Sequence, residues 1–150
     1  MLIVMKVYFD VCCLNRPFDD QKQDRVHLEA EAILSVLKHI DEGNWELVSS
    51  DAVIYEINNT ANEERRNRLL SINNSAQIYV TVDETIFKRG VVIQEMGFTT
   101  YDAMHIACAE SIQADIFLST DKKLTNKAVR NKSKLLVAIQ NPLAWIQEEF

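Results

Sequence analysis

The residues most able to do chemistry are four acids, Asp10, Glu56, Asp102 and Asp121. Asp10 and Asp121 each come just after a short apolar run, and Asp102 opens an alanine-rich segment. Crowded carboxylates repel one another and raise each other's pKa, so a protein tolerates such a cluster mainly where cations neutralise it. Hard oxygen ligands that leave positions open suit Mg²⁺ or Mn²⁺. Such a metal activates water and stabilises charge on a phosphate, so the pattern predicts phosphodiester hydrolysis.

Each acid also has a structural interpretation. Asp102 and Asp121 would both be favoured at helix N-termini by charge and capping, and taken alone neither interpretation prevails. Glu56 could be a solvated helix residue. Asp10 is the hardest to explain structurally, because a charge directly after a buried strand is costly unless it is paired or metal-bound. His105 lies one turn after Asp102 and could be a ligand or a base; a lone helical histidine is more often structural, so it stays outside the predicted site.

The elements that must position these acids alternate along the chain. Apolar runs rich in β-branched and aromatic residues predict strands over residues 3–9, 45–49, 77–82, 115–119 and 135–139. Apolar spacing and capping residues predict helices over residues 22–42, 51–58, 61–73 and 83–96, from Thr99, after Asp121 and from Pro142. Asp51 and Asp83 are the predicted caps of their helices, and residues 15–17 are predicted to form a loop. Four further residues are expected to help cap the helices that follow them, namely Ser49, Ser50, Ser119 and Thr120.

This order predicts an α/β fold. The strands read as continuous apolar runs, which favours a parallel sheet covered by helices on both faces. Sites in such sheets form at the carboxyl ends of the strands, where the four acids would meet at one edge. The chain has 150 residues and no repeat, low-complexity segment or linker, so we expect a single domain over residues 1–150.

Composition excludes several classes. With 47% hydrophobic and 25% charged residues the chain is typical of a globular protein, and no apolar run approaches the length of a membrane span. Residues 1–9 are apolar but meet Asp10 with no small-residue cleavage site, so a signal peptide is not expected; Met5 could equally be the true start. Cys12, Cys13 and Cys108 do not suggest a disulfide framework or a zinc site, and are expected to be reduced thiols in the cytoplasm.

The net charge of −6 disfavours a protein that grips nucleic acid over its whole surface. Positive charge is nevertheless concentrated in two places. Residues 122–150 hold 6 basic and 2 acidic side chains, and a smaller cluster comprises Arg65, Arg66 and Arg68. Either cluster could guide a polyanion to the acids, although a solvated helix face explains each one equally well.

The segments IVMKVYFD, DAVIYEI, TTYDAMHIACAE and DIFLSTDKKL carry the four acids in order. Together they resemble the PIN-domain family over essentially the whole chain. The third segment is the most specific, because the family often has an acid opening an alanine-rich helix. The resemblance implies a three-layer α/β/α fold with a central parallel sheet, and a Mg²⁺- or Mn²⁺-dependent endoribonuclease that hydrolyses RNA. It also implies that Asp10 and Asp102 bind metal directly, with Glu56 and Asp121 completing the acidic metal pocket.

Small members of the family are commonly toxins of the VapC kind, often dimeric and paired with an antitoxin protein that blocks the site. The resemblance therefore implies an RNA substrate, an antitoxin partner and a homodimer. The chain departs from the family at two places. Many members have Ser, Thr or Asn soon after the first acid, a role for which Asn15 is the candidate here. Many also have another acid beyond the fourth, where this chain has Lys122 and Lys123, which leaves a second metal position open.

Other interpretations remain. One is a PIN-like RNA- or protein-binding regulator with little catalysis. Another is a different Mg²⁺ phosphohydrolase, but a dehalogenase-like enzyme needs Asp where Cys12 stands, and a receiver would pair adjacent acids where Phe9 and Asp10 stand. Arg16 could contact substrate or a partner, or form a structural salt bridge. The sequence leaves the RNA target open, and DNA cleavage is compatible with the same scheme.

Overall fold

Five short strands form one all-parallel sheet in the computed structural model, which describes residues 4–149. The order across the sheet is β3-β2-β1-β4-β5. The strands are β1 (Met5–Phe9), β2 (Trp45–Ser50), β3 (Ile78–Val80), β4 (Ile116–Leu118) and β5 (Ile139–Gln140). The first strand of the chain therefore lies in the middle, and the chain builds outward from it in both directions.

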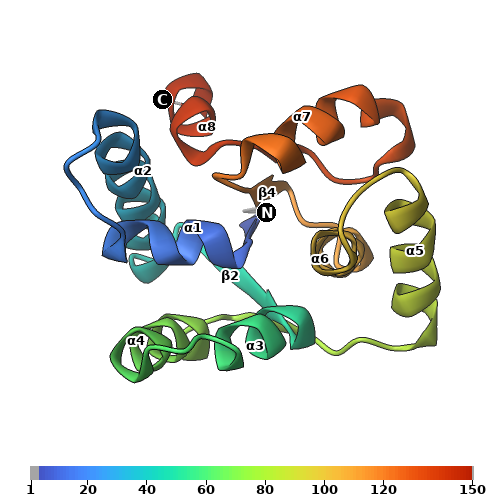
Figure 1. Cartoon of the computed structure of the whole chain (residues 1–150), viewed down its shortest axis with the longest axis horizontal. Helices are drawn as coiled ribbons and strands as arrows, with labels where there is room; N and C mark the ends of the chain where they lie inside the picture. The colour runs from blue at the N-terminus through green and yellow to red at the C-terminus, as the bar shows by residue number, and fades with distance from the viewer. Residues whose placement is uncertain (1–3, 150) are drawn as a thin grey trace.

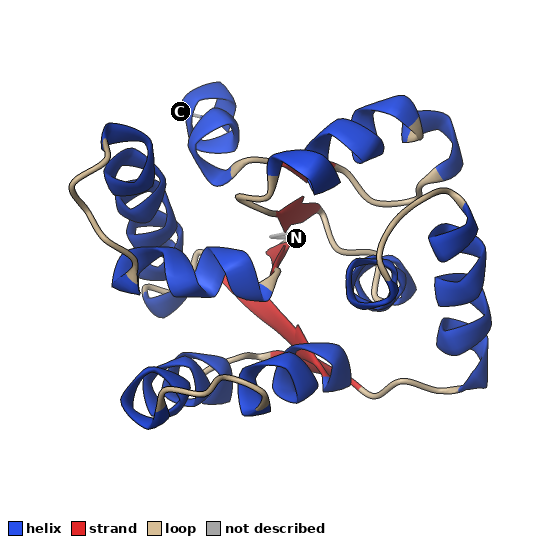
Figure 2. Ribbon diagram, in the orientation of Figure 1, coloured by secondary structure: helices blue, strands red, loops and turns tan. Residues whose placement is uncertain are grey.

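Helices connect the strands and cover the sheet on both faces, so the fold has three layers, α/β/α (Figures 1 and 2). Within the described residues they are α1 (Val11–Asn15), α2 (Asp24–Asp41), α3 (Asp51–Asn58), α4 (Glu63–Asn74), α5 (Glu84–Glu95), α6 (Thr100–Ser111), α7 (Lys122–Arg130) and α8 (Pro142–Glu149). Two short 3₁₀ turns, η1 (Arg16–Phe18) and η2 (Lys132–Lys134), follow α1 and α7. The predicted fold class and the parallel sheet are confirmed.

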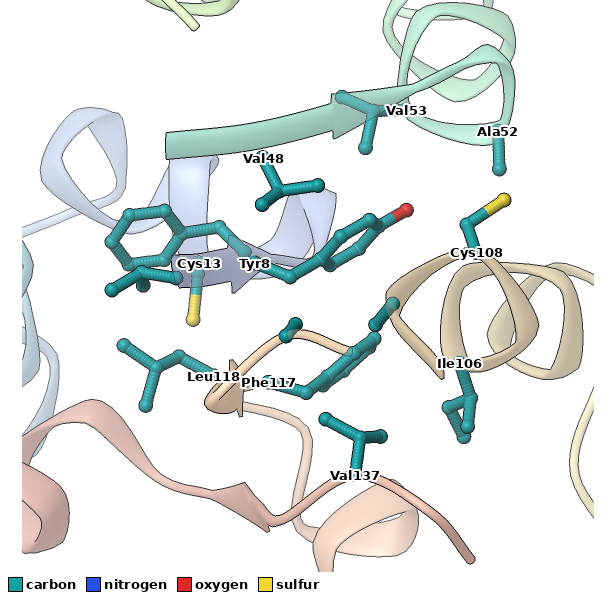
Figure 3. Packing of buried hydrophobic residues seen from close by; sticks show 14 of the residues in the cluster. Tyr8, Cys13, Val48, Ala52, Val53, Ile106, Cys108, Phe117, Leu118 and Val137 are labelled. Carbon is teal, nitrogen blue, oxygen red and sulfur yellow. The ribbon is translucent and has the colours of Figure 1, made fainter. Parts of the chain in front are cut away.

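The central strands are buried because helices cover both of their faces. Val7 pairs with Leu47 of β2 on one side and with Ile116 of β4 on the other. Tyr8 stacks on Phe117 with 5.2 Å between ring centroids, at the centre of the packing that Figure 3 shows. A continuous apolar run is what a strand in this position requires, since both faces must be apolar.

The predicted loop over residues 15–17 is wrong. Residues Val11–Asn15 form α1. Pro17 lies at the start of η1, a position whose backbone N–H has no partner within the helix, so proline costs no hydrogen bond there. Helix α1 begins where it does because the carboxylate of Asp10 accepts a hydrogen bond from the backbone N–H of Cys13. A single side-chain cap thus starts a helix too short for sequence periodicity to reveal.

The last strand was predicted too early, over residues 135–139, whereas β5 is Ile139–Gln140. Glu110 of α6 explains the difference. Its carboxylate accepts the backbone N–H of Leu136 at 2.8 Å and also pairs with Arg89, which donates to the backbone carbonyl of Lys134. These side chains take backbone groups that a longer strand would have used in the sheet.

Of the caps predicted for α3, Asp51 is wrong and Ser50 is confirmed. Ser50 is the cap, and its hydroxyl accepts from the backbone N–H of Val53. The carboxylate of Asp51 instead accepts the hydroxyl of Tyr79 and the backbone N–H of Val82. Asp51 therefore holds the chain just beyond β3 against the start of α3, while the predicted cap Asp83 does begin α5.

Helix α8 begins at Pro142 as predicted, but the described residues that it buries are Pro142 and Trp145. Leu143 and Ile146 of the predicted face are only half-buried. The predicted strand residue Ile3 and helix residue Phe150 lie outside the described residues. Among residues 4–149, no helix combines the length and the apolar character needed to cross a bilayer.

A buried charge cluster joins α2 to the C-terminal part of the fold. Glu29 is 1% exposed; its carboxylate lies 3.0 Å from Arg16 Nε and 3.3 Å from Arg25 Nε. The contact with Arg16 is an ion pair without the alignment of a hydrogen bond. Asn141 Nδ2 donates to the same carboxylate, and Arg25 also donates to the backbone carbonyl of Thr120. The cluster therefore holds together α2, η1, and the segments before α7 and α8.

We expect Glu29→Gln to lower the free energy of unfolding by about 2 kcal/mol, because it leaves Arg16 and Arg25 without their counter-charge. The estimate is below the usual cost of breaking a buried pair because both arginines keep contact with water. Urea denaturation would measure it. The control is Glu31→Gln, an exposed acid on the same helix, which should change stability by less than about 0.5 kcal/mol. Equal stability of the two variants would contradict a stabilising role for the cluster.

Candidate active site

Asp10 lies at the carboxyl end of the central strand and is 3% exposed. Its Oδ1 accepts the backbone N–H of Cys13 at 2.9 Å, and its Oδ2 accepts the hydroxyl of Ser119 at 2.5 Å. Burial raises the pKa of Asp10 from 3.8 to about 6, although these two hydrogen bonds and the charge of His105 oppose the shift. The negative charge of Asp102 raises the pKa further. The site therefore contains a buried carboxylate held in place through both oxygens.

Asp102 and Asp121 both sit at helix N-termini. The backbone N–H of Asp102 donates to Thr99, which caps α6, and the carboxylate of Asp121 caps α7 by accepting the N–H of Lys123. Burial is the largest cause that raises the pKa of Asp102, and the charges of Asp121 and Glu56 also raise it. The capping interpretation is thus correct in geometry for Asp121, yet both acids also act electrostatically on the same site.

Glu56 lies on α3 and is held from the interior of the protein. Its Oε1 is 3.3 Å from Nε2 of His105, which is 1% exposed. The other ring nitrogen of His105 is 2.7 Å from the hydroxyl of Tyr8, and that hydroxyl is 2.8 Å from Oγ of Ser50. This buried chain runs from the sheet to Glu56. His105 therefore holds Glu56, an acid of the predicted site, from the interior of the protein.

The four predicted acids share one neighbourhood. Ser119 joins two of them, since its hydroxyl donates to Asp10 and accepts the backbone N–H of Asp121. Glu56 contacts His105 of α6, the helix whose first turn carries Asp102. The thiol of Cys12 on α1 lies near the same acids. Burial raises the pKa of Cys12 to about 12, and the charges of Asp10, Glu56, Asp121 and Asp102 add to the shift.

The acids do not form a compact ligand set in the described residues, and several of them are hydrogen-bonded within the protein. In the part of the chain that the structure describes, no three His, Cys, Asp or Glu residues are arranged to hold a metal ion. Asp10 is bonded to Ser119 and Cys13, Glu56 to His105, and Asp121 to the start of α7. The donor atoms are nevertheless all of the hard oxygen type that Mg²⁺ and Mn²⁺ prefer.

An open cleft of about 510 Å³ adjoins Asp121. It is lined by Cys12, Asn15, Arg16, Asp19, Thr60, Arg65, Thr120 and Asp121. Asn15 donates its amide to the backbone carbonyl of Val11, and its Oδ1 is a buried oxygen with no hydrogen-bond partner. An oxygen without a donor beside a cluster of acids fits a site for a cation, so the donor chemistry of the cleft agrees with a divalent metal.

Two arginines form a cationic wall of this cleft. Arg65 pairs with Asp19 at 3.2 Å and donates to the backbone carbonyl of Phe18. Arg16 pairs with Asp19 and with Glu29, so its structural salt bridges are real, and it also lines the cleft. Of the two basic clusters in the sequence, only Arg65 of the smaller one lines the cleft.

A model of the PIN domain matches residues 7–130 of the chain. The chain belongs to the PIN-domain family. Two solved structures of similar fold are VapBC2 from Rickettsia felis, crystallised with a DNA fragment from the VapBC2 promoter, and PAE2754 from Pyrobaculum aerophilum. No curated protein sequence matches the chain significantly.

The likeness to these two structures concerns the fold. VapBC2 is 11% identical with a TM-score of 0.55, over 91% of this chain and 98% of that chain. PAE2754 is 18% identical with a TM-score of 0.50, over 83% of this chain and 87% of that chain. At such identities the polypeptides share an architecture, and the chemistry of this PIN domain has to be argued from its own residues.

Sequence reasoning missed the role of Ser119. Its hydroxyl donates to Asp10 and accepts the backbone N–H of Asp121, so one side chain connects the first and last acids of the predicted site. The buried Tyr8 was likewise assigned only to a strand. The one available signal was a polar Ser-Thr pair at the end of a fully apolar run, directly before Asp121.

The raised pKa of Asp10 predicts how stability depends on pH. Because the folded-state pKa is about 6 and the ordinary value is 3.8, the folded PIN domain binds this proton more tightly than the unfolded chain. The free energy of unfolding should therefore fall as pH rises from about 4 to about 6, by up to about 3 kcal/mol, and stay lower above that range.

Asp10→Asn should remove this pH dependence, because the amide side chain does not titrate. The amide can still hydrogen-bond to Cys13 and Ser119, so the variant should be more stable than the parent above pH 6. Urea denaturation across this range, with chelator present, would measure the difference. The exposed Asp41→Asn is the control, with no change expected in the slope. If Asp10→Asn and the parent showed the same pH dependence, Asp10 would not carry the shifted titration.

Proposed function

We propose that this PIN domain is an endoribonuclease that uses Mg²⁺ or Mn²⁺ to hydrolyse phosphodiester bonds of RNA. PIN domains are generally nucleases and typically use divalent metal ions. The observation that carries the proposal is that hydrogen bonds connect the segments that carry the acids: Ser119 joins Asp10 to Asp121, and His105 joins Glu56 to α6, the helix of Asp102. An acidic cluster assembled from four distant segments suits a cation better than a structural role.

In this proposal Asp10 and Asp102 bind the metal, with Glu56 and Asp121 completing the pocket. The metal would supply Lewis-acid activation of water and stabilisation of charge on the phosphate. Ser119 fixes the direction of the Asp10 carboxylate, and His105 fixes that of Glu56.

Arg16 and Arg65 line the cleft beside Asp121, where both pair with Asp19. Their guanidinium groups would contact the phosphates of an RNA that enters the cleft.

We further propose that the PIN domain is the toxin of a VapBC-type pair. The VapBC2 structure, a toxin–antitoxin complex of similar fold, supports an antitoxin protein as partner. A partner that covered the cleft beside Asp121 would block the site. The proposal includes a single domain over residues 1–150, a homodimer, and a cytoplasmic location, where the thiols of Cys12, Cys13 and Cys108 would remain free.

A second candidate is a PIN-like RNA- or protein-binding regulator with little catalysis. It is favoured by one observation, that both oxygens of Asp10 already accept hydrogen bonds within the protein. A carboxylate oxygen accepts more than one partner, so these bonds leave room for a metal. Cleavage assays separate the two candidates.

Asp102→Asn should lower RNA cleavage by about 100-fold or more, because even the outer partners of metal ligands cost about 10- to 100-fold when removed. The measurement uses a panel of labelled RNAs with Mn²⁺, with Mg²⁺ and with chelator. The exposed Asp24→Asn on α2 should behave like the parent. Cleavage that persists in chelator or in Asp102→Asn would contradict the metal-dependent site. A Mn²⁺-induced thermal shift without any cleavage would favour a very narrow RNA target, and neither shift nor cleavage would favour the regulator.

Asn15→Ala should lower cleavage by about 10-fold if the unpartnered Oδ1 contacts the metal or its water shell. Its thermal midpoint should change little, since only the bond to Val11 is lost. Single-turnover kinetics would measure the effect, with the exposed Asn67→Ala on α4 as the matched control. Parent-like rates in Asn15→Ala would show that this oxygen serves no purpose in the reaction.

A further inference from the structure

Two exposed tyrosines pair at the edge of the acidic site. Tyr55 directly precedes Glu56 on α3, and Tyr101 directly precedes Asp102 on α6. Their ring centroids are 5.8 Å apart with 31° between the ring planes. Tyr55 is 59% exposed and Tyr101 is 44% exposed, so neither ring contributes much to the core.

The helices that carry the pair also carry two acids of the predicted site. Helices α3 and α6 pack against each other, and Glu56 and Asp102 stand next to Tyr55 and Tyr101 on them. Glu56 Oε1 lies 3.3 Å from Nε2 of His105 on α6, so a contact between the two helices holds the acid that follows Tyr55.

The residues next to the pair along the chain indicate which class of ligand it would bind. The exposed residues from Tyr55 to the C-cap of α3, and from the N-cap of α6 to Tyr101, are polar apart from the tyrosines, namely Asn58, Asn59, Thr99 and Thr100. A protein interface usually surrounds its aromatic anchors with further apolar area, which is missing from these positions. Nucleobases need only a flat aromatic face, and proteins that bind single-stranded nucleic acid stack bases on exposed tyrosines.

We propose that the Tyr55–Tyr101 pair is a stacking platform for an unpaired nucleobase, next to the phosphate that is cleaved. The proposal rests on the proposed function, because it takes the acids to be the cleavage site. The two tyrosines directly precede Glu56 and Asp102 on α3 and α6, whereas the arginine-lined cleft adjoins Asp121. A base of the RNA strand would thus be held beside Glu56 and Asp102, and the phosphate backbone of the strand would be held beside Asp121. Bases within a duplex are stacked on each other and cannot use the platform.

Binding tests the platform independently of cleavage. The full chain carrying Asp102→Asn, with Mn²⁺ present, would be titrated into short fluorescein-labelled single-stranded RNAs and into the matching duplexes. A second probe carries 2-aminopurine, whose fluorescence falls when the base stacks. We expect binding to the single strand to be tighter than to the duplex, with quenching of 2-aminopurine.

In that background, Tyr55→Ala and Tyr101→Ala should each weaken single-strand binding by about 5- to 100-fold and reduce the quenching. Tyr55→Phe and Tyr101→Phe keep the aromatic face and should keep most of the binding. Phe87→Ala removes an aromatic ring of similar exposure, 55%, from α5 and is the matched control. In the active enzyme the alanine variants should raise KM more than they lower kcat.

Several results would overturn the platform. They are absent single-strand binding, equal affinity for single strand and duplex, parent-like affinity of both alanine variants, and equal losses in the phenylalanine and alanine variants. A changed oligomeric state with unchanged RNA binding would assign the pair to a contact between protein chains instead. Failure of the nuclease proposal gives a different result, namely tyrosine-dependent binding of single-stranded RNA by a parent protein that cleaves none of the panel.

Discussion

The buried carboxylate of Asp10 is the constraint on which the site depends. It ends the central strand, where its backbone N–H still bonds to the carbonyl of Leu118, and it is 3% exposed. One carboxylate oxygen accepts the backbone N–H of Cys13 and so caps α1. This cap places Cys12 and Asn15 of α1 beside the acids. The other accepts the hydroxyl of Ser119 at the point where the chain leaves β4. One side chain thus fixes the relation between two strand exits, and burial raises its pKa to about 6 as a consequence.

Structural and functional interpretations of the acids describe the same geometry. A helix that follows a parallel strand begins at the carboxyl edge of the sheet, which is where sites form in such folds. An acid that caps such a helix is favoured by the helix dipole and is also brought to the site. Asp121 caps α7 and yet acts on Cys12 together with the other acids. Asp102 lies in the first turn of α6 and does the same. The helix dipoles therefore help to hold like charges together that would otherwise repel.

Most of the fold could be predicted because the apolar pattern along each segment agrees with its final environment. The runs that became β1 and β2 are buried by helices on both faces, and Gly43 and Gly97 follow α2 and α5 with φ values of +81° and +108°. Prediction failed where a distant side chain controls the backbone. The carboxylate of Glu110 accepts the backbone N–H of Leu136, 26 residues later in the chain. That N–H is therefore not available for pairing in a longer β5. No local pattern around Leu136 carries that information.

The same distinction separates the acids from the residues that hold them. Three of the acids could be proposed from the sequence because each stands at a recognisable local position: Asp10 and Asp121 follow apolar runs, and Asp102 lies at the start of a helix. Glu56 lies inside α3, the helix that follows β2. Their supports are defined only by the fold: Ser119 meets Asp10 across 109 residues, and His105 meets Tyr8 across 97. A serine at a strand end or a histidine inside a helix has many uses, and only the packed structure selects one of them. Because a buried acid cannot keep its direction without such partners, the supporting residues determine whether an acidic cluster can work as a site.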